Sequence, residues 1–173
     1  WAILIVLLTI VVACNDEASK PSIEKLDEVN ENVQAVIDMT SDDKFASVIE
    51  LAKKAVLKNT ADVILTKDNI TELQNATGNM YYALVEDVDM TDVTYLATQV
   101  DATAFTGTFN GMGHKIYNFT APDSRGGLFE VTKANALIKN LDLHAKTNTQ
   151  KAVLIGQVKG LTTIDNCNFW IDK

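Results

Sequence analysis

The sequence predicts a mainly β protein, a right-handed parallel β-helix that follows an N-terminal α-helical segment. Two observations on the 173-residue chain lead to this fold class. From about residue 61 onward, β-branched and aromatic residues occur in short runs that Gly, Asn and Asp interrupt, which is typical of short strands and tight turns. In that half of the chain the pattern Ile-x-Asn-apolar recurs after 22 and then 26 residues. A repeat of this length with two or three short strands has the size of one β-helix coil.

The three copies of the pattern begin at Ile116, Ile138 and Ile164. Apolar and polar residues alternate after the last two copies, so stacking the coils about 4.8 Å apart predicts which residues become neighbours. The expected inner neighbours are Leu141, Leu143 and Ala145 with Cys167, Phe169 and Ile171, and the expected outer neighbours are Asp142, His144 and Lys146 with Asn168, Trp170 and Asp172. Similarly, GGLF at 126–129 lies 26 residues before AVLI at 152–155. Leucine-rich repeats have a similar period, but their LxxLxL signature is absent.

An asparagine occupies the same place in each copy, at Asn118, Asn140 and Asn166. At a bend between strands, a side-chain amide can donate to the amide of one neighbouring coil and accept from that of the other. We therefore predict that these three side chains form a structural ladder.

Three glycines lie close together in FTGTFNGMGHKIYNF, residues 105–119. Gly107, Gly111 and Gly113 do not have the GxGxxG spacing, and a strand follows them where a dinucleotide-binding fold requires a helix. We interpret them as turn glycines, because the pair Asn110-Gly111 favours a backbone with positive φ.

The chain begins with an uncharged run of twelve residues, WAILIVLLTIVV, which Ala13 and Cys14 follow. As a helix this run spans roughly 18 Å, which is too short for a bilayer core of about 30 Å but suits the apolar region of a signal peptide. VVAC resembles the lipobox of bacterial lipoproteins, which implies that Cys14 is lipidated. We expect residues 1–14 to be part of a lipoprotein signal peptide, and the protein to be lipid-anchored in the bacterial cell envelope and exposed at its surface. A buried apolar strand is the alternative for this run.

Residues 15–60 predict an acidic tether and two amphipathic helices. Apolar residues at about 22–38 recur at steps of three and four, and a second such run begins at Ser41 and ends in lysines that suit a helix C-terminus. Residues 61–173 then form the β-helix. We expect further coils after it, and the chain to be a fragment, because a last coil without a cap exposes strand edges.

Several segments of the β-helix region follow a recognisable order. FTGTFNGMGHKI resembles the pattern F-x-G-x-F-D-G-x-G-H-x-I, and GGLFEV and ALIKNLDL resemble the GLF and IKNL segments that accompany it. These are features of the GLUG-type β-helix repeats of bacterial surface proteins. The chain departs from the pattern at Asn110, where Asp is usual, and at Val153 and Ile155 in the second GLF. The resemblance covers residues 68 to about 173 and implies an adhesin-like lipoprotein, or the non-catalytic N-terminal region of an IgA-protease-type zinc metallopeptidase.

Few residues are candidates for metal chemistry. His114 and His144 are the only histidines; neither belongs to an HExxH motif or has a partner at zinc spacing, so we predict no zinc site. His144 is expected on the outer surface beside Trp170. Asp87, Asp89 and Asp92 are calcium candidates, since alternation places the first two on one face, and a solvated strand edge is the alternative.

The charge and the motifs together bound the function. The chain has a formal charge of -8 and a single arginine, so it lacks the clustered basic residues that nucleic acid requires. We expect no nucleic-acid partner, no cofactor and no catalytic residue. The predicted function is a non-catalytic binding, adhesion or scaffold module, attached to the membrane by its lipid and binding a glycan or a protein. The alternative is the N-terminal scaffold of a larger surface peptidase or carbohydrate-active enzyme whose active site lies outside this chain.

Overall fold

The computed structural model describes residues 61–121, 126–147 and 152–172. The chain divides into two compact units, Trp1–Ala61 and Asp62–Lys173, and the described strands all belong to the second. The predictions for the signal peptide with Cys14, for the tether and for the two amphipathic helices lie outside the described residues.

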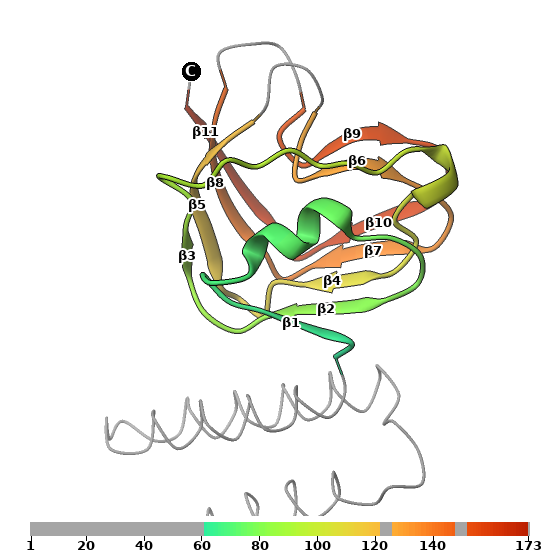
Figure 1. Cartoon of the computed structure of the whole chain (residues 1–173), viewed down its shortest axis with the longest axis horizontal. Coiled ribbons are helices and arrows are strands. Elements are labelled where there is room, and N and C mark those ends of the chain that lie inside the picture. Colours follow the sequence, from blue (N-terminus) through green and yellow to red (C-terminus); the bar gives the residue numbers. More distant parts are fainter. Residues whose placement is uncertain (1–60, 122–125, 148–151, 173) are drawn as a thin grey trace, which may run out of the picture. The chain divides into compact units, whose positions relative to one another are not determined.

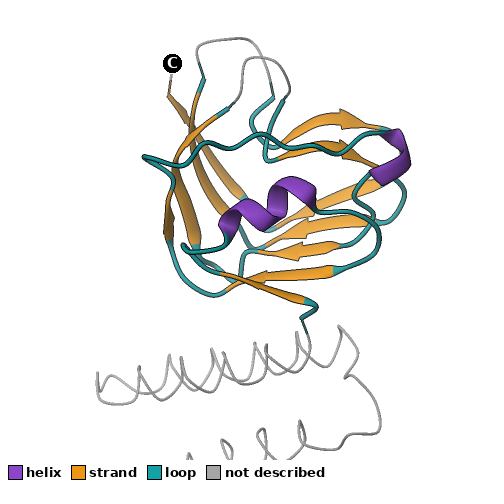
Figure 2. Cartoon of the chain, viewed as in Figure 1, coloured by secondary structure: helices purple, strands orange, loops and turns teal. Residues whose placement is uncertain are grey.

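Strands and loops make up most of the described chain, with two short 3-10 helices (Figure 2). The helices are η1 (Ile70–Asn75) and η2 (Asp101–Thr103). The strands are β1 (Val63–Leu65), β2 (Tyr81–Leu84), β3 (Val88–Asp89), β4 (Thr108–Asn110), β5 (Lys115–Thr120), β6 (Phe129–Thr132), β7 (Ala136–Lys139), β8 (Asp142–Lys146), β9 (Ile155–Val158), β10 (Thr162–Asp165) and β11 (Asn168–Asp172).

The strands stack into three parallel sheets, which form the sides of a solenoid of about 3 turns (Figure 1). A five-stranded sheet has the order β1-β2-β4-β7-β10, a four-stranded sheet the order β11-β8-β5-β3, and a two-stranded sheet pairs β6 with β9. Each coil visits the three sheets in turn, so β4, β5 and β6 form one coil and β7, β8 and β9 the next. The prediction of a parallel β-helix is confirmed.

The register of the later coils agrees with the repeat found in the sequence. Leu143 pairs with Phe169 and His144 with Trp170 between β8 and β11, and Phe129 pairs with Ile155 between β6 and β9. These pairs are 26 residues apart, as predicted, because the two coils have equal length and their inner residues stack on one another.

The first copy of the repeat was aligned wrongly. Ile116 lies in the four-stranded sheet and pairs with Leu143, whereas Ile138 and Ile164 pair with each other in the five-stranded sheet. The residue that stacks on Ile138 from the preceding coil is Phe109. The pattern Ile-x-Asn therefore marks two different positions of a coil, and a longer connection between β4 and β5 hides the true spacing.

The asparagine ladder therefore has a different first asparagine from the one predicted, Asn110 in place of Asn118. The Nδ2 of Asn166 donates to Oδ1 of Asn140 at 2.8 Å, and Nδ2 of Asn140 donates to Oδ1 of Asn110 at 3.1 Å. Asn110 in turn donates to the hydroxyl of Tyr81 at 3.1 Å, which carries the ladder to a fourth coil position. Asn118 is not a member, so that part of the prediction was wrong. Asn140 and Asn166 have φ angles of 52° and 47°, a left-handed conformation that Asn tolerates better than most residues.

The structure requires glycine at these three positions for two different reasons. A side chain at Gly111 would collide with the backbone of Asn140 and Leu141 in the next coil, and one at Gly107 would collide with the backbone of Met80 in the preceding coil. Only Gly113 has a positive φ, 80°, and it has open space around it. The turn interpretation holds for Gly113, whereas Gly107 and Gly111 allow close contact between coils, which the sequence did not reveal.

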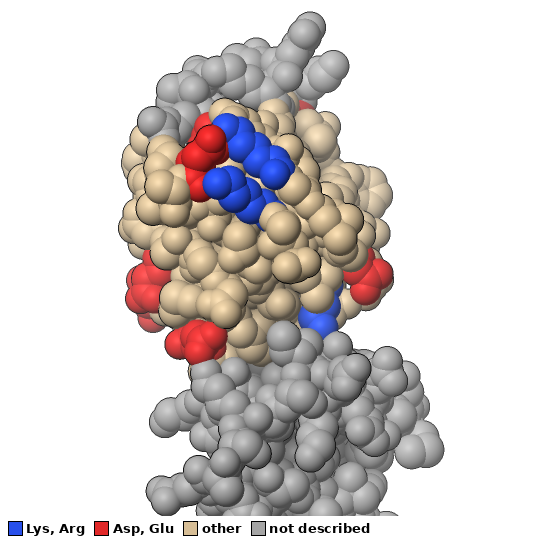
Figure 3. Space-filling model, turned by 90° about the vertical axis from the view of Figure 1, so that its right-hand side faces the viewer, with Lys and Arg blue, Asp and Glu red and all other residues tan. Residues whose placement is uncertain are grey.

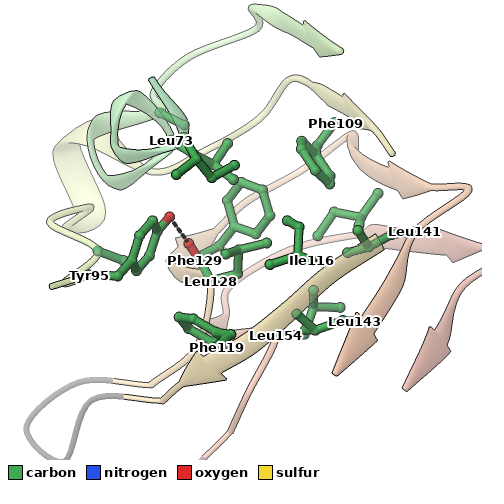
Figure 4. Packing of buried hydrophobic residues seen from close by; sticks show 14 of the residues in the cluster. Leu73, Tyr95, Phe109, Ile116, Phe119, Leu128, Phe129, Leu141, Leu143 and Leu154 are labelled. Carbon is green, nitrogen blue, oxygen red and sulfur yellow. Dashed lines mark hydrogen bonds between the residues drawn. The ribbon is translucent and has the colours of Figure 1, made fainter. Parts of the chain in front are cut away.

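The interior of the solenoid is filled by stacked aromatic and aliphatic side chains (Figure 4). Phe105 and Phe129 stack with ring centroids 4.8 Å apart, and Phe109 meets Phe129 edge to face at 5.8 Å. Tyr95 packs edge to face on Phe119 and donates its hydroxyl to the carbonyl of Leu128 at 2.8 Å. Burial raises the pKa of the Tyr95 phenol, because loss of water around the group disfavours the charged phenolate.

The two ends of the described solenoid differ. At one end η1 lies across the interior, and its Ile70 and Leu73 are buried in the core (Figure 1). At the other end Ile164 and Phe169 are 49% and 40% exposed, whereas Ile138 and Leu143, on which they stack, are fully buried. Of the helices in the described ranges, neither has the length and apolar character needed to cross a membrane.

Candidate functional site

The outer side of the four-stranded sheet carries three rows of side chains that run along the solenoid axis. On the inner side of this sheet, the stacked residues of successive coils are Val88, Ile116, Leu143 and Phe169. Their neighbours in each strand point outward, because side chains alternate along a strand. We call this outer side the polar face. Its first row is Asp87, Lys115, Asp142 and Asn168, its central row is Asp89, Tyr117, His144 and Trp170, and its third row is Thr120, Lys146 and Asp172.

A β-bulge in β5 shapes the middle of the polar face. Ile116 pairs with Leu143 and Phe119 with Ala145, so β5 has one more residue than β8 between these two pairs. The extra residue is accommodated by Asn118, whose φ is 56°. Bulges of this kind bend a strand and redirect its side chains. As a result, Tyr117 and Asn118 together oppose a single residue of the next coil, His144.

Asn118 anchors the bulge to the preceding coil. Its Nδ2 donates to Oδ1 of Asp89 at 2.9 Å and approaches the hydroxyl of Thr91 at 3.0 Å. The hydroxyl of Thr91 also donates to Asp89, at 2.6 Å. The hydrogen bonds from Thr91 and Asn118 hold the pKa of the Asp89 carboxyl below its usual range, although Asp89 itself is exposed.

Each of the two histidines, His114 before β5 and His144 on the polar face, lies beside an aspartate. Nδ1 of His114 is 3.2 Å from Oδ1 of Asp87, which also accepts the backbone N–H of Lys115 at 2.9 Å. Nε2 of His144 is 3.1 Å from Oδ1 of Asp142, and both of these atoms are buried and form no hydrogen bond of good geometry. His144 also neighbours Trp170, and the centroids of the two rings lie 5.7 Å apart with an angle of 39° between the ring planes. The surface position predicted for His144 beside Trp170 is confirmed.

A hollow of about 420 Å³ lies on the polar face. The side chains around it include Asp87, Lys115, Tyr117, His144, Lys146 and Asp172. Its volume is within the range of about 300 to 1,000 Å³ that is typical of small-molecule sites. The hollow thus combines carboxylate acceptors, ammonium donors and aromatic rings, and the formal charges of its two lysines and two aspartates cancel.

The three calcium candidates are not gathered in one place by the fold. Asp87 and Asp89 lie on the polar face and already accept hydrogen bonds, whereas Asp92 is exposed in the turn after β3. In the described parts of the chain, no three His, Cys, Asp or Glu side chains come together to hold a metal ion.

A second charged group links the edges of two coils. Lys159 forms an ion pair with Asp101, and Lys133 donates to the backbone carbonyl of Asp101. Figure 3 shows basic side chains gathered beside acidic ones on a mostly uncharged side of the molecule. Both lysines lower the pKa of the exposed Asp101 carboxyl, through the hydrogen bond from Lys159 first. This group joins η2 to the connections after β6 and β9, which is a structural role.

Cys167 is half-buried at the end of the interior. Its Sγ lies 3.2 Å from the carbonyl of Asp165, and the side chain packs against the hydrophobic core. Burial raises the pKa of the thiol, which disfavours the reactive thiolate. These contacts suit the inner position at which the repeat predicts Cys167.

The sequence reasoning missed the two residues that give the hollow its shape, Tyr117 and Asn118. The signal was present, because the inner residues Ile116 and Phe119 are three positions apart where alternation requires two. It also missed that Lys115 and Lys146, from strands of different coils, lie on opposite sides of the central row. Only the register between coils brings these side chains to one hollow.

Comparisons of the chain with protein-family models, with curated proteins and with solved structures found no match. The resemblance to GLUG-type repeats stays a prediction, and the polar face is the candidate site that its geometry supports.

Proposed function

We propose that this chain is a non-catalytic binding module of the bacterial cell surface, held at the envelope by a lipid on Cys14, and that it attaches to a glycan or protein through the polar face. The β-helix serves as the rigid support, because residues fixed in stacked strands keep their spacing better than residues on loops.

One observation carries the binding part of this proposal. The polar face has a hollow of about 420 Å³ that Tyr117 and His144 of the central row line, and Trp170 follows His144 in the same row. Trp170 is 62% exposed at the end of that row, although most tryptophans are largely buried. Exposed aromatic side chains beside fixed polar groups are typical of binding surfaces, since they offer a large contact area with little entropy to lose.

The non-catalytic part of the proposal is supported by the resemblance to GLUG-type repeats, which occur in non-catalytic regions of surface proteins. The hollow is lined by carboxylate, ammonium, amide, phenol and imidazole groups, and no Ser or Cys side chain is among its lining residues. A larger surface enzyme that uses this β-helix as its N-terminal scaffold is the alternative function, and its active site would lie in other parts of that protein.

The binding proposal is tested by probing the purified chain with arrays of glycans and peptides. We expect a specific signal that Trp170→Ala weakens strongly. The matched control is Gln157→Ala, which truncates an exposed residue of β9 in the two-stranded sheet, and it should bind like the unaltered chain. Equal binding by all three proteins would contradict the role of the polar face, and release of products from a bound glycan or peptide would contradict the non-catalytic assignment.

The anchoring proposal is tested separately by labelling bacteria that express the chain with radioactive palmitate. We expect the label on the unaltered chain and its loss in Cys14→Ser, because the thiol of Cys14 is the attachment point implied by the lipobox-like VVAC. The control is Cys167→Ser, which should keep the label. Unchanged labelling of Cys14→Ser would overturn the lipoprotein assignment.

A further inference from the structure

We propose that the polar face binds a neutral, hydroxyl-rich oligosaccharide that lies along the solenoid axis, with its sugar rings over the central row from Tyr117 to Trp170. This inference rests on the proposed function, and it names the ligand class and its orientation at the same site.

The orientation follows from the stacking of the coils. Tyr117, His144 and Trp170 come from three successive coils and are neighbours in the register of β5, β8 and β11. Coils are separated by about 4.8 Å, so the row is roughly 10 Å long. This is the length of a disaccharide, and a longer chain would continue past either end of the row.

The aromatic rings provide the apolar part of the contact. A sugar ring presents C–H groups on its flat side and hydroxyl groups at its rim, so it can rest on an aromatic ring and still form hydrogen bonds at its edge. The rings of His144 and Trp170 lie 5.7 Å apart. Nε2 of His144 also lies 3.1 Å from Oδ1 of Asp142, so a carboxylate stands beside the imidazole ring.

The flanking rows provide the polar part of the contact and indicate a neutral ligand. Around the hollow, Lys115 and Lys146 lie on opposite sides of the central row. Asp87 and Asp172 come from the first and the last of the coils that line the hollow. An acidic ligand would meet both carboxylates, and a basic ligand would meet both ammonium groups. A hydroxyl group donates and accepts, so a neutral sugar can bond to both kinds of group without a charge conflict.

The experiment measures equilibrium binding of three kinds of probe to the full chain by calorimetry. The probes are neutral tetrasaccharides of glucose, galactose or mannose, a tetrasaccharide of hexuronic acid, and an acidic hexapeptide. We expect one neutral tetrasaccharide to bind. Its affinity should change less than about twofold between low and high salt, since the ligand itself carries no charge that salt could screen. We expect Trp170→Ala to weaken it roughly tenfold or more, and the control Gln157→Ala to leave it unchanged.

Two charge variants distinguish the ligand classes. Lys146→Gln and Asp172→Asn should each weaken a neutral sugar by several fold, because each removes a hydrogen bond of one kind. For an acidic ligand the two variants would act in opposite directions, with Asp172→Asn strengthening the binding. Salt-sensitive binding of the uronic acid or the peptide that Trp170→Ala abolishes would overturn this inference but leave the binding module standing. If no probe on glycan or peptide arrays depends on Trp170, the proposed function fails as well.

Discussion

The asparagine ladder gives the sharpest test of how the coils are held together. Asn140 is its middle member, and it accepts a hydrogen bond from Asn166 and donates one to Asn110. Its backbone is in the left-handed conformation, with a φ of 52°. Replacing Asn140 by Ala removes both hydrogen bonds and forces alanine into that conformation.

The loss of stability in Asn140→Ala has two parts, the hydrogen bonds and the backbone conformation. A hydrogen bond contributes about 0.5 to 1.5 kcal/mol to stability, and the bond to the exposed Asn166 belongs at the low end of that range. The two bonds together contribute about 1.5 to 2 kcal/mol. A left-handed backbone costs alanine about 1 to 2 kcal/mol. We expect Asn140→Ala to lower the free energy of unfolding by about 3 kcal/mol, which corresponds to a fall in Tm of roughly 10 to 25 °C.

The assay is urea unfolding of the purified chain, followed by circular dichroism, with two controls. Asn135→Ala places alanine at a φ of 71° where the asparagine side chain is outside the ladder, so it should lose only the backbone part, about 1 to 2 kcal/mol. Asn140→Gly keeps the backbone conformation and should lose only the hydrogen bonds. If Asn140→Ala destabilises no more than Asn135→Ala, the ladder contributes nothing and the reasoning is refuted.

Two other predictions concern the packed interior and the contact between coils. Tyr95→Phe should cost about 1 to 2 kcal/mol at neutral pH, because the carbonyl of Leu128 loses its buried donor. Because the pKa of Tyr95 is raised in the folded protein, its contribution to the free energy of unfolding is complete below pH 10, the ordinary pKa, and is lost as the pH rises further. Unfolding curves at pH 8 to 11 should therefore show the stabilities of the two proteins converging. A stability difference that stays constant over this range would contradict the prediction. Gly111→Ala should destabilise by about 2 to 4 kcal/mol because its new side chain meets backbone of the next coil, whereas Gly113→Ala should cost only about 1 to 2 kcal/mol for its φ of 80°; thermal unfolding would contradict the close-packing argument if the order were reversed.

The sequence predicted the coils correctly where their lengths are equal. Phe169 stacks on Leu143, and Trp170 on His144, at the 26-residue spacing seen in the sequence. It failed in the preceding coil, where Ile116 was matched to Ile138 although Phe109 takes that place. The connection between β4 and β5 and the bulge at Asn118 change the count of residues, so a fixed period no longer finds the stacked partners.

The candidate site was predictable in part. Alternation placed His144 and Trp170 on outward positions and Asp87 on one face with Asp89, and the structure puts these residues on the polar face. The contribution of Tyr117 was missed, because the bulge that turns it toward His144 is a feature of the pairing between β5 and β8.

The sequence by itself determined the alternation of inner and outer side chains, the presence of stacked coils and the need for asparagine at their corners. These follow from local properties, namely the period of a strand and the conformations that Asn and Gly allow. Only the tertiary structure decided that Asn110 rather than Asn118 joins the ladder, that Gly111 makes room for a neighbouring coil, and that four successive coils build one hollow. The physical reason is that in a parallel β-helix each residue meets its partner one coil away, and that partner depends on the length of every turn between them.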